Sequence, residues 1–433
     1  MPRSRIDPRD HTIQFRQALR RYLPQKGLPL IGKKGRWSDR MLVLTALLMA
    51  VSSLGSLQER LSEARAAVVR MYPSRRRPGE SYAGFIGQLV RHSQRLLALV
   101  TAALRQRMIR QAGASWKVGR HLAFGVDGTK SDAPRTQANR KGLKTAGKSG
   151  PQQLLVMLLH IGTGLPWSWR RGKATDSERD LLRELLDALP AGALLLLDAG
   201  FTGYALLQHI LATGRPVLVR AGANVTLLQK LGWEFKFHGD TVYVWPEKAR
   251  AAGGEPLVLR RIVVVDGRNR RMCLLTNLSE AELTFAEAVA LYRRRWGIEV
   301  FFRGLKQTLA RRKMLSDSPE HAGVELDWTL VGYWVLGFLL WENRPAGAPV
   351  TQGLAWALRL VRGALAGRGD KRGSVATAWR QFTVDRYRRT RPKAAADWPH
   401  KKNDPPCGMP QLRTATAAEK RCAQQLARRK RAA

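Results

Sequence analysis

Apolar and polar residues alternate with a helical period from residue 13 to about residue 112, within a predicted helical domain of residues 1–115. The pattern predicts several helices there, broken near residues 27–29 and again at 72–82. Ser38 and Ser81 each stand directly before an apolar run, which is the position of a helix N-cap. Short helices with Arg-rich turns predict a helical DNA-binding domain, for which a helix-turn-helix is one form. A helical bundle that only packs on the next domain would give the same pattern.

Short runs of consecutive apolar residues replace this period in the region 116–345. Strands are predicted in the apolar run LAFGV (122–126), in QQLLVMLLHIGTG, in LPWSWRRG and in ALLLLDAGF, and a helix at 175–189 precedes the last of them. Early strands joined by tight turns are expected to be antiparallel, whereas the later alternation of strands and helices indicates crossover units. The predicted fold class is therefore α/β, with a ribonuclease-H-like mixed sheet preceded by the helical N-terminal domain.

Two further regions differ in composition. Residues 221–283 are rich in strand-forming residues and contain the turn signals HGD and DGRN, which predicts a β-rich insertion in the sheet domain. After the boundary signal RPAGAP, residues 346–433 are expected to form a basic C-terminal region that is partly disordered. Its tail, which ends in LARRKRAA, is expected to be poorly ordered and would add affinity for phosphate.

The balance of charge narrows the class of partner. The 433 residues include 75 Lys and Arg against 33 Asp and Glu, which gives a formal net charge of +42. Nucleic acid is the commonest partner of such a field, and its affinity comes largely from counterion release. Ribosomal proteins are as basic, but 44% hydrophobic residues indicate a folded core beneath the charge.

Other classes of protein fit the sequence less well. Three cysteines without a CxxC pair give no zinc site and fit a reducing cytosol, and the first residues do not form a signal peptide. The apolar stretches 41–57 and 330–341 are predicted to be buried helices, because the first is interrupted and the second is too short to span a membrane. GLKTAGKS at 142–149 matches a phosphate loop in its letters, but no apolar strand leads into it. We therefore expect no membrane association and no nucleotide cofactor.

Two aspartates share one position in the predicted sheet. Asp127 follows the apolar run AFGV, and Asp198 follows LLLL. A carboxylate at the end of a buried strand is held rigidly and is desolvated on one side, as a metal ligand should be. Each alone would more often be a turn or helix-cap residue, but two in one sheet of a strongly basic chain favour a metal site.

The segment YRRRWGIEVFFRGLKQ, residues 292–307, belongs to a helix predicted to begin near Thr284. One face of this helix carries four polar side chains: Tyr292, Arg295, Glu299 and Lys306. At about 100° per residue they fall within an arc of roughly 60°, opposite apolar residues that can pack on the sheet. A salt bridge from Glu299 to Arg295 or Arg303 would explain the local pairing. It would not explain the Tyr and the Lys on the same arc.

Three carboxylates suit phosphodiester chemistry. Two Mg²⁺ ions about 3.5–4 Å apart can activate water and stabilise the leaving oxygen, and they need about three carboxylate ligands. Asp127, Asp198 and Glu299 could supply these ligands. Arg295 and Lys306 would then hold phosphates, the Arg through its fork and the Lys as a point charge.

The spacing of the four polar residues, Y-x2-R-x3-E-x6-K, resembles the Y-R-E-K signature of the bacterial insertion-sequence transposases of the DDE superfamily, in the branch numbered four. VDGT around Asp127, DAGF around Asp198 and the β-rich insertion before the Glu-bearing helix add to the resemblance. It covers roughly residues 116–343. The four-residue signature is specific, whereas the two aspartate motifs are weak when taken alone.

The resemblance implies a role for each matching position. Asp127, Asp198 and Glu299 correspond to the catalytic, metal-binding triad, with two Mg²⁺ ions that Mn²⁺ can replace. Three residues correspond to those that grip the transposon end: Tyr292, Arg295 and Lys306. In some members a Trp before the LLT strand stacks on a flipped base, and Met272 stands at that place here, where it would stack less strongly. Trp245 is a weaker substitute candidate.

A cut-and-paste transposase is the function that the resemblance implies. It would bind terminal inverted repeats, cleave through a DNA hairpin, and join the 3′ ends to target DNA. Its partners would be double-stranded DNA and a second copy in a synaptic homodimer, in the cytoplasm at the bacterial nucleoid. Another ribonuclease-H-like nuclease, such as a resolvase, fits the Tyr-Arg-Glu-Lys face less well. A catalytically inactive DNA-binding protein derived from a transposase is the alternative, although it predicts loss of an acidic ligand.

Overall fold

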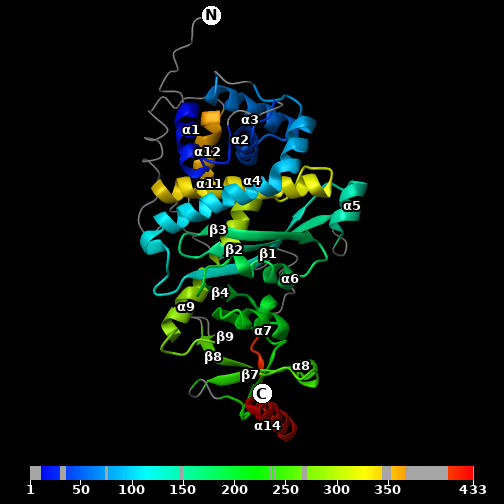
Figure 1. Ribbon diagram of the computed structural model, residues 1–433, viewed down its shortest axis with the longest axis vertical. Coiled ribbons are helices and arrows are strands. Elements are labelled where there is room, and N and C mark those ends of the chain that lie inside the picture. Colours follow the sequence, from blue (N-terminus) through cyan, green and yellow to red (C-terminus); the bar gives the residue numbers. More distant parts are fainter. Residues whose placement is uncertain are drawn as a thin grey trace, which may run out of the picture. The chain divides into compact units, whose positions relative to one another are not determined.

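The protein divides into two compact units, which are described separately (Figure 1). The computed structural model describes residues 11–29, 36–73, 77–145, 150–234, 237, 240–265, 271–343, 353–365 and 408–432. Unit 1 comprises Met1–Trp116, Gly128–Asp176 and Glu299–Arg386, and unit 2 comprises Lys117–Asp127, Ser177–Ile298 and Tyr387–Ala433. The predicted domains, divided near residues 115 and 345, differ from these units because each unit collects segments that are distant in the sequence.

Unit 1 contains the predicted N-terminal helices. These are α1 (His11–Tyr22), α2 (Asp39–Val51), α3 (Leu57–Met71) and α4 (Tyr82–Gln111), and the short 3-10 turn η1 (Gly113–Ser115) follows them. Ser38, Ser56 and Ser81 each accept a hydrogen bond from a backbone N–H in the first turn of α2, α3 and α4. The helical N-terminal region is therefore confirmed, with two of its caps at the predicted serines.

Two later helices complete the core of unit 1. α11 (Pro319–Asn343) contacts α2 and α4, and α12 (Leu354–Leu365) contacts α1 and α11. Among the described residues, α11 is the one helix long and apolar enough to cross a membrane by length and composition. Its apolar window is 94% buried inside the protein, which agrees with the predicted buried helix.

The β-structure of unit 1 includes a hairpin. β2 (Gln152–His160) and β3 (Leu165–Lys173) pair in the antiparallel sense, as predicted, and α5 (Gln137–Leu143) precedes them. α5 includes the first two residues of GLKTAGKS, so a helix rather than a buried strand leads into this sequence. Residues 146–149 lie outside the described residues. The strand-loop-helix context of a phosphate loop is therefore absent on the described side.

Unit 2 is built on a mixed sheet whose strands follow the order β10-β6-β7-β8-β9-β5-β4-β1. β4 (Leu194–Leu197) pairs in parallel with the start of β1 (Ala123–Asp132) and with β5 (Val217–Ala221). β9 (Arg271–Thr276) pairs with β5 in the antiparallel sense. The connections carry α6 (Glu178–Arg183), the 3-10 turns η2 (Leu186–Ala188) and η3 (Ala199–Phe201), and α7 (Tyr204–Ala212). This combination of parallel and antiparallel strands confirms the predicted ribonuclease-H-like α/β class.

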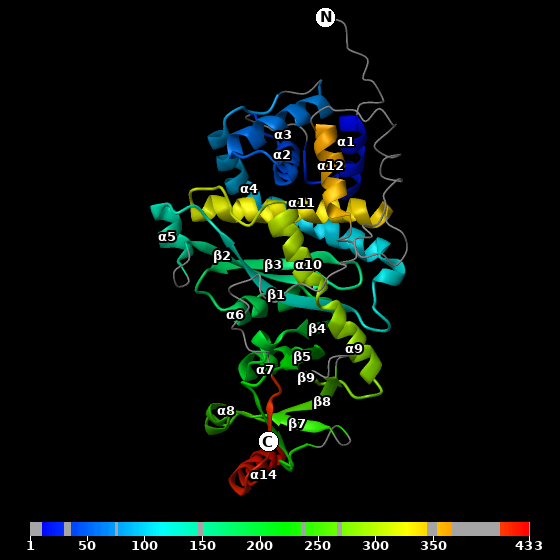
Figure 2. The ribbon, with the colours of Figure 1, turned by 180° about the vertical axis from the view of Figure 1, so that it is seen from behind.

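The predicted β-rich insertion is present in unit 2, and the end of the chain packs on it (Figure 2). The insertion contains β6 (Thr226–Gln229), β7 (Thr241–Val244), α8 (Glu247–Ala251) and β8 (Leu257–Val265). β10 (Gln411–Thr414) pairs in parallel with β6, and α14 (Ala417–Ala432) follows it. The expectation of a poorly ordered tail is therefore wrong for these last two elements, while residues 366–407 lie outside the described residues.

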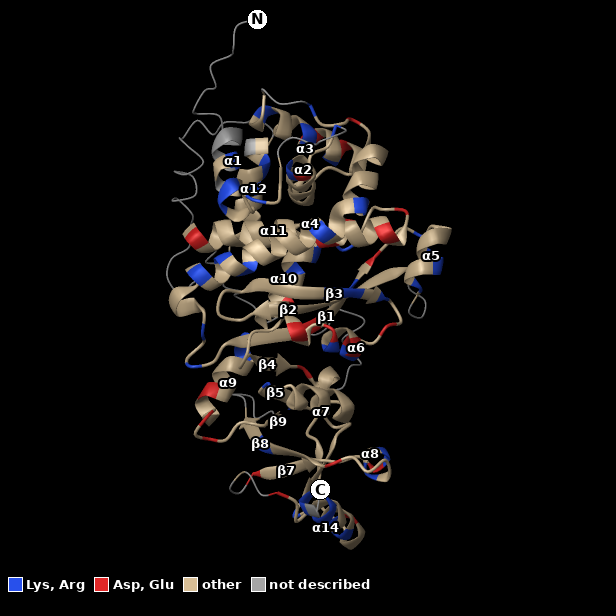
Figure 3. Cartoon of the chain, viewed as in Figure 1, with Lys and Arg blue, Asp and Glu red and all other residues tan. Residues whose placement is uncertain are grey.

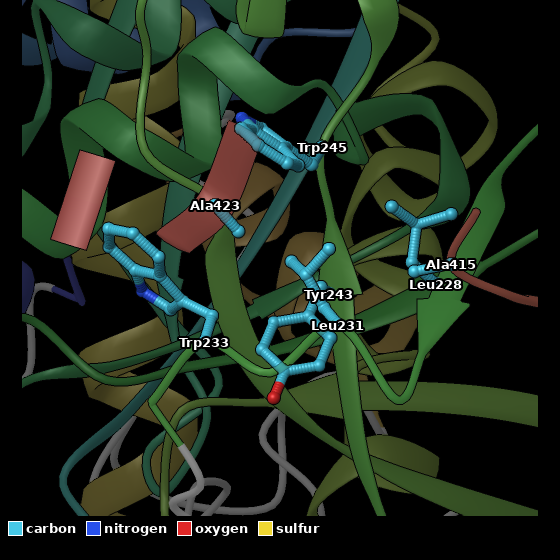
Figure 4. Close-up of a cluster of buried hydrophobic side chains, with 7 residues drawn as sticks. All are labelled: Leu228, Leu231, Trp233, Tyr243, Trp245, Ala415 and Ala423. Carbon is cyan, nitrogen blue, oxygen red and sulfur yellow. The ribbon is translucent and has the colours of Figure 1, made fainter. Parts of the chain in front are cut away.

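A cluster of buried side chains joins the insertion to the end of the chain (Figure 4). Its members are Leu228, Leu231, Trp233, Tyr243, Trp245, Ala415 and Ala423. Trp245 is 3% exposed, and its indole N–H donates a hydrogen bond to the carbonyl of Gly254 at 2.7 Å. Its ring is thus a core side chain of the insertion. The suggestion that it stacks on a base is wrong.

Candidate active site

Asp127 and Asp198 lie level with each other on neighbouring strands of unit 2. The parallel register places Gly125 opposite Leu196, and the same offset continued by two residues places Asp127 opposite Asp198. Neighbouring strands are about 4.8 Å apart, and partners in a parallel register point to the same face. Asp198 directly follows β4, as predicted, whereas Asp127 lies within β1, which continues to Asp132.

Both aspartates follow buried stretches of chain, and their side chains are partly exposed. Each residue of β4 and the four residues of β1 before Asp127 are buried. The side chain of Asp127 is 23% exposed and that of Asp198 is 39% exposed. Asp198 also caps η3, because its Oδ1 accepts a hydrogen bond from the N–H of Ala199 at 2.8 Å. A ligand can therefore reach two carboxylates whose positions are fixed by the sheet.

Arg295 lies against both aspartates. Its Nη1 is 3.9 Å from Oδ2 of Asp127, and its Nη2 is 4.0 Å from Oδ2 of Asp198. The Arg295 side chain is only 8% exposed, so water and salt screen these interactions less than they would on an open surface. Two carboxylates on adjacent strands repel each other, and the guanidinium offsets that repulsion.

Tyr292 adds a hydrogen-bond donor to the same group. Its hydroxyl donates to Oδ1 of Asp198 at 3.4 Å, which is long for such a bond. Its ring centroid is 5.6 Å from Cζ of Arg295. Burial raises the pKa of Tyr292 well above that of ordinary tyrosine, although Arg295 acts in the opposite direction. The hydroxyl therefore keeps its proton at neutral pH and acts as a donor.

The helix α9 (Phe285–Arg294) holds Tyr292 in this place. Thr284 and Glu287 form a capping box, in which each side chain accepts a hydrogen bond from the backbone N–H of the other. Arg120 also pairs with Glu287 at 2.9 Å, and this hydrogen bond is the main reason why the pKa of Glu287 is lowered to about 2. The start of α9 is thereby fixed, and Tyr292 and Arg295 follow at a spacing of three residues.

The single helix predicted across residues 284–307 is interrupted. α9 ends at Arg294, and α10 (Gly297–Arg303) begins after a turn at Arg295 and Trp296. In this turn Arg295 N–H donates to the carbonyl of Tyr292 at 3.1 Å, which is a tighter spacing than in an α-helix. Gly297 follows the turn, and glycine has a low helix propensity. The prediction of one regular helix is therefore wrong.

A π-helical turn, η4 (Gly304–Thr308), follows α10 and changes the rotation again. The predicted arc assumed a uniform rotation of about 100° per residue from Tyr292 to Lys306. Because the turn and the π-helical segment change this rotation, the assumption does not place Glu299 and Lys306 on the same face as Tyr292 and Arg295. Glu299 and Lys306 belong to unit 1, where both are half-buried. Their place relative to the two aspartates stays a prediction.

Two of the side chains predicted to bind metal lie close together in unit 2. Asp127 and Asp198 present carboxylate oxygens, which are the ligands that Mg²⁺ prefers. Within the described ranges, no group of three or more His, Cys, Asp or Glu side chains that could hold a metal is found. Two of the three predicted ligands are thus brought together, and Glu299 as the third stays a prediction.

Met272, the predicted base-stacking residue, is less exposed than a neighbouring aromatic side chain of the site. Met272 is half-buried in β9 opposite Val264, and no described contact joins it to the aspartates. Trp296, which sequence reasoning missed, is 55% exposed and directly follows Arg295. It is the most exposed large apolar side chain among the described residues. The available signal was an aromatic residue directly after three arginines, in YRRRW.

Comparison with known proteins identifies this domain. Residues 119–334 match the family model described as the transposase DDE domain, and they include Asp127, Asp198 and Glu299. The chain belongs to the DDE transposases. The resemblance inferred from the Y-R-E-K spacing is therefore confirmed, and the three acidic residues lie within the DDE domain of this transposase.

Two known transposases are similar to this DDE transposase. Transposase InsG for insertion sequence element IS4 of Escherichia coli (strain K12) is 26% identical over 225 residues, which are 48% of this chain and 50% of the relative. The chain thus spans about half the length of this curated relative. The cryo-EM structure of the piggyBac transposase synaptic complex with hairpin DNA is 11% identical, with a TM-score of 0.41, and the match covers 82% of this chain and 76% of that chain.

Proposed function

We propose that this DDE transposase cuts and joins DNA at the site of Asp127 and Asp198, with Glu299 as the third carboxylate. It binds terminal inverted repeats, hydrolyses the phosphodiester at the transposon end with a DNA hairpin as intermediate, and joins the 3′ ends to target DNA by a cut-and-paste route. The observation that supports this most strongly is the pair of level carboxylates on adjacent parallel strands, facing one buried guanidinium.

The donor set fits two Mg²⁺ ions, for which Mn²⁺ can substitute. Asp127, Asp198 and Glu299 would hold them through carboxylate oxygens, and the partial exposure of both aspartates would leave room for ligands from solvent and DNA. When bound, such ions supply an activated water and stabilise the charge on the phosphate. The protein supplies the rigid positions of the carboxylates.

The basic and phenolic residues position the DNA. Arg295 compensates the aspartates in the absence of DNA, and its planar fork can also bind a phosphate in a bidentate way. Tyr292 stays protonated and donates a hydrogen bond beside the reacting group. Lys306 binds a phosphate as a point charge. The net charge of +42 draws duplex DNA to a cluster of acids that would otherwise repel it.

A synaptic homodimer is the proposed assembly, in which two copies bring together the two transposon ends before joining them to target DNA. Transposition takes place in the cytoplasm, at the nucleoid. The joining reaction supports this arrangement, because both ends must be held together when they meet one target.

Trp296 is proposed as the surface on which an unpaired base stacks, in preference to Met272. Trp296→Ala should weaken binding of an end duplex with one unpaired base by about 1–3 kcal/mol, and Trp296→Phe should retain most of the affinity. Fluorescence anisotropy with paired and unpaired duplexes measures the difference. Phe285→Ala is the control. Phe285 is an aromatic residue that is also exposed, at 49%, and it lies at the opposite end of α9, the helix that Arg295 and Trp296 follow. Equal losses from both Ala variants would contradict the role of Trp296.

A cleavage assay tests the proposed function. Purified protein is mixed with Mg²⁺ and labelled duplex DNA from the region that flanks its own gene. We expect nicks at a terminal repeat and a hairpin product on a denaturing gel. Binding without cleavage, in Mn²⁺ as well as in Mg²⁺, would instead support a catalytically inactive DNA-binding protein derived from a transposase.

A further inference from the structure

The last helix, α14, presents two different faces. Its inward face packs on the β-rich insertion of unit 2 through Ala423 and the partly buried Cys422, Leu426 and Ala427. Ala423 belongs to the cluster that contains Trp233 and Trp245 (Figure 4), and the other three residues pack against this cluster. Because β10 also pairs with the edge strand β6, the end of the chain is attached to the insertion by both a strand and a helix.

A buried carboxylate fixes the start of α14. Glu419 is 4% exposed, and its two oxygens accept hydrogen bonds from Nη1 and Nη2 of Arg413 at 2.8 and 2.7 Å. Arg250 of α8 donates to the same carboxylate, and the N–H of Thr416 donates at 2.8 Å. These charge-assisted bonds, first among them those of Arg413, lower the pKa of Glu419 to about 2. The orientation of the helix on the insertion is thereby set.

The outward face of α14 is basic and amide-rich. At about 100° per residue an arc of about 100° contains four exposed side chains: Arg421, Gln424, Gln425 and Arg428. Arg429 and Arg431 flank this arc and are also exposed, and Figure 3 shows the concentration of Lys and Arg on this helix. None of these arginines forms an ion pair with another residue that the structure describes.

Stability of the helix explains only part of this pattern. Cations near a helix C-terminus interact favourably with the helix dipole, but the effect is confined to the last turn and Arg421 lies outside it. Lys430 lies on the side of α14 that faces the insertion, and although it is exposed its charge is paired with Glu255 of the insertion at 2.9 Å. The outward arginines repel each other unless a polyanion lies against them.

We infer that the outward face of α14 is a second DNA-binding surface, which holds the phosphate backbone of duplex DNA independently of sequence. Guanidinium and amide donors are the groups that contact phosphate and sugar in protein–DNA complexes. A membrane surface is a poorer fit, because the outward arc carries no apolar side chain to enter a bilayer. This inference rests on the proposed function, since it adds a contact to DNA that the active site cuts or joins.

The salt dependence of binding tests this surface. The full-length protein is titrated with a short fluorescent duplex of arbitrary sequence at several salt concentrations. Arg421→Gln with Arg428→Gln should make the negative slope of log K against log salt shallower by about 2, because each lost phosphate contact removes about 0.9 from its magnitude. The proposal is overturned if this double variant keeps the wild-type slope, or if it loses affinity for duplex RNA of the same length but not for DNA.

A matched pair of single variants separates the surface from general charge. Arg428→Gln and Lys430→Gln each remove one positive charge from the same helix, two residues apart, on its outward and inward faces. Only Arg428→Gln should make the negative slope shallower, by about 1. Equal changes from both variants would overturn the proposal, and circular dichroism checks that both proteins remain folded.

The outcomes distinguish this surface from the active site. If the wild-type protein cleaves its own transposon ends and the two single variants have equal slopes, the α14 surface fails and the proposed function stands. If the wild-type protein binds but does not cleave, the proposed function fails, and the slopes on arbitrary duplex still decide for or against α14.

Discussion

Asp127→Asn should lower the rate of DNA strand cleavage about a thousandfold or more, with little change in binding to the transposon end. The substitution keeps the shape of the side chain and removes one of the two carboxylate charges that face Arg295. Charge stabilisation at a metal-assisted site contributes several kcal/mol to the transition state, and each 1.4 kcal/mol corresponds to a factor of about ten. Single-turnover cleavage of a labelled end duplex measures the rate.

Asp187→Asn provides the control for this substitution. Asp187 is exposed on η2 in the same unit, so the change in charge is the same but no site is touched. Its cleavage rate should equal that of the wild type. Wild-type cleavage by Asp127→Asn, or loss of binding with unchanged cleavage of the bound DNA, would contradict the role assigned to Asp127.

Arg311→Met should destabilise the protein by about 3 kcal/mol or more. The Arg311 side chain is fully buried in unit 1, and its Nη2 donates to the carbonyls of Met49, Ala50 and Ser52 at 3.1, 3.0 and 3.0 Å. These carbonyls lie at the C-terminal end of α2, where the last carbonyls of a helix lack their usual N–H partners four residues on; that of Met49 also accepts from the cap N–H of Ser52 at 3.3 Å. Methionine fills the space but donates nothing, and each buried unsatisfied polar group costs about 1–3 kcal/mol.

Arg312→Met is the control, since the neighbouring side chain is exposed and its replacement should change the stability by no more than about 0.5 kcal/mol. Thermal unfolding followed by circular dichroism should show a Tm lower by roughly 6 °C or more for Arg311→Met. Equal Tm values for the two variants would show that Arg311 does not support α2.

The sequence predicts the parts of the site that depend on local pattern. The apolar runs before Asp127 and Asp198 predict buried strands and therefore rigid carboxylates, and both strands are found. Their level alignment depends on the register between strands about seventy residues apart, which no local pattern specifies. The approach of Arg295 to both carboxylates depends on that register as well, so the sequence indicated a phosphate ligand but not this ion pair.

The structure differs from the sequence-based predictions at two places, and tertiary packing is the reason for both differences. The break at Arg295 and Trp296 has only Gly297 as its local signal, and one glycine is often tolerated inside a helix. The composition of the last residues is typical of disorder, yet Ala423 and Leu426 are covered by an insertion nearly two hundred residues upstream. Composition reports the average polarity of a segment and does not show which distant surface covers its few apolar residues.

Mn²⁺ binding tests the proposed metal site most directly. The affinity for Mn²⁺ is measured by isothermal titration calorimetry, in the absence of DNA, for the wild type and for Asp127→Asn, Asp198→Asn and Glu299→Gln, with Asp187→Asn as the control. Each of the first three variants should lose at least about tenfold in affinity, as expected when a charged ligand is removed, and the control should bind like the wild type. Wild-type affinity in all three variants, or in Glu299→Gln alone, would contradict a site built from these three carboxylates.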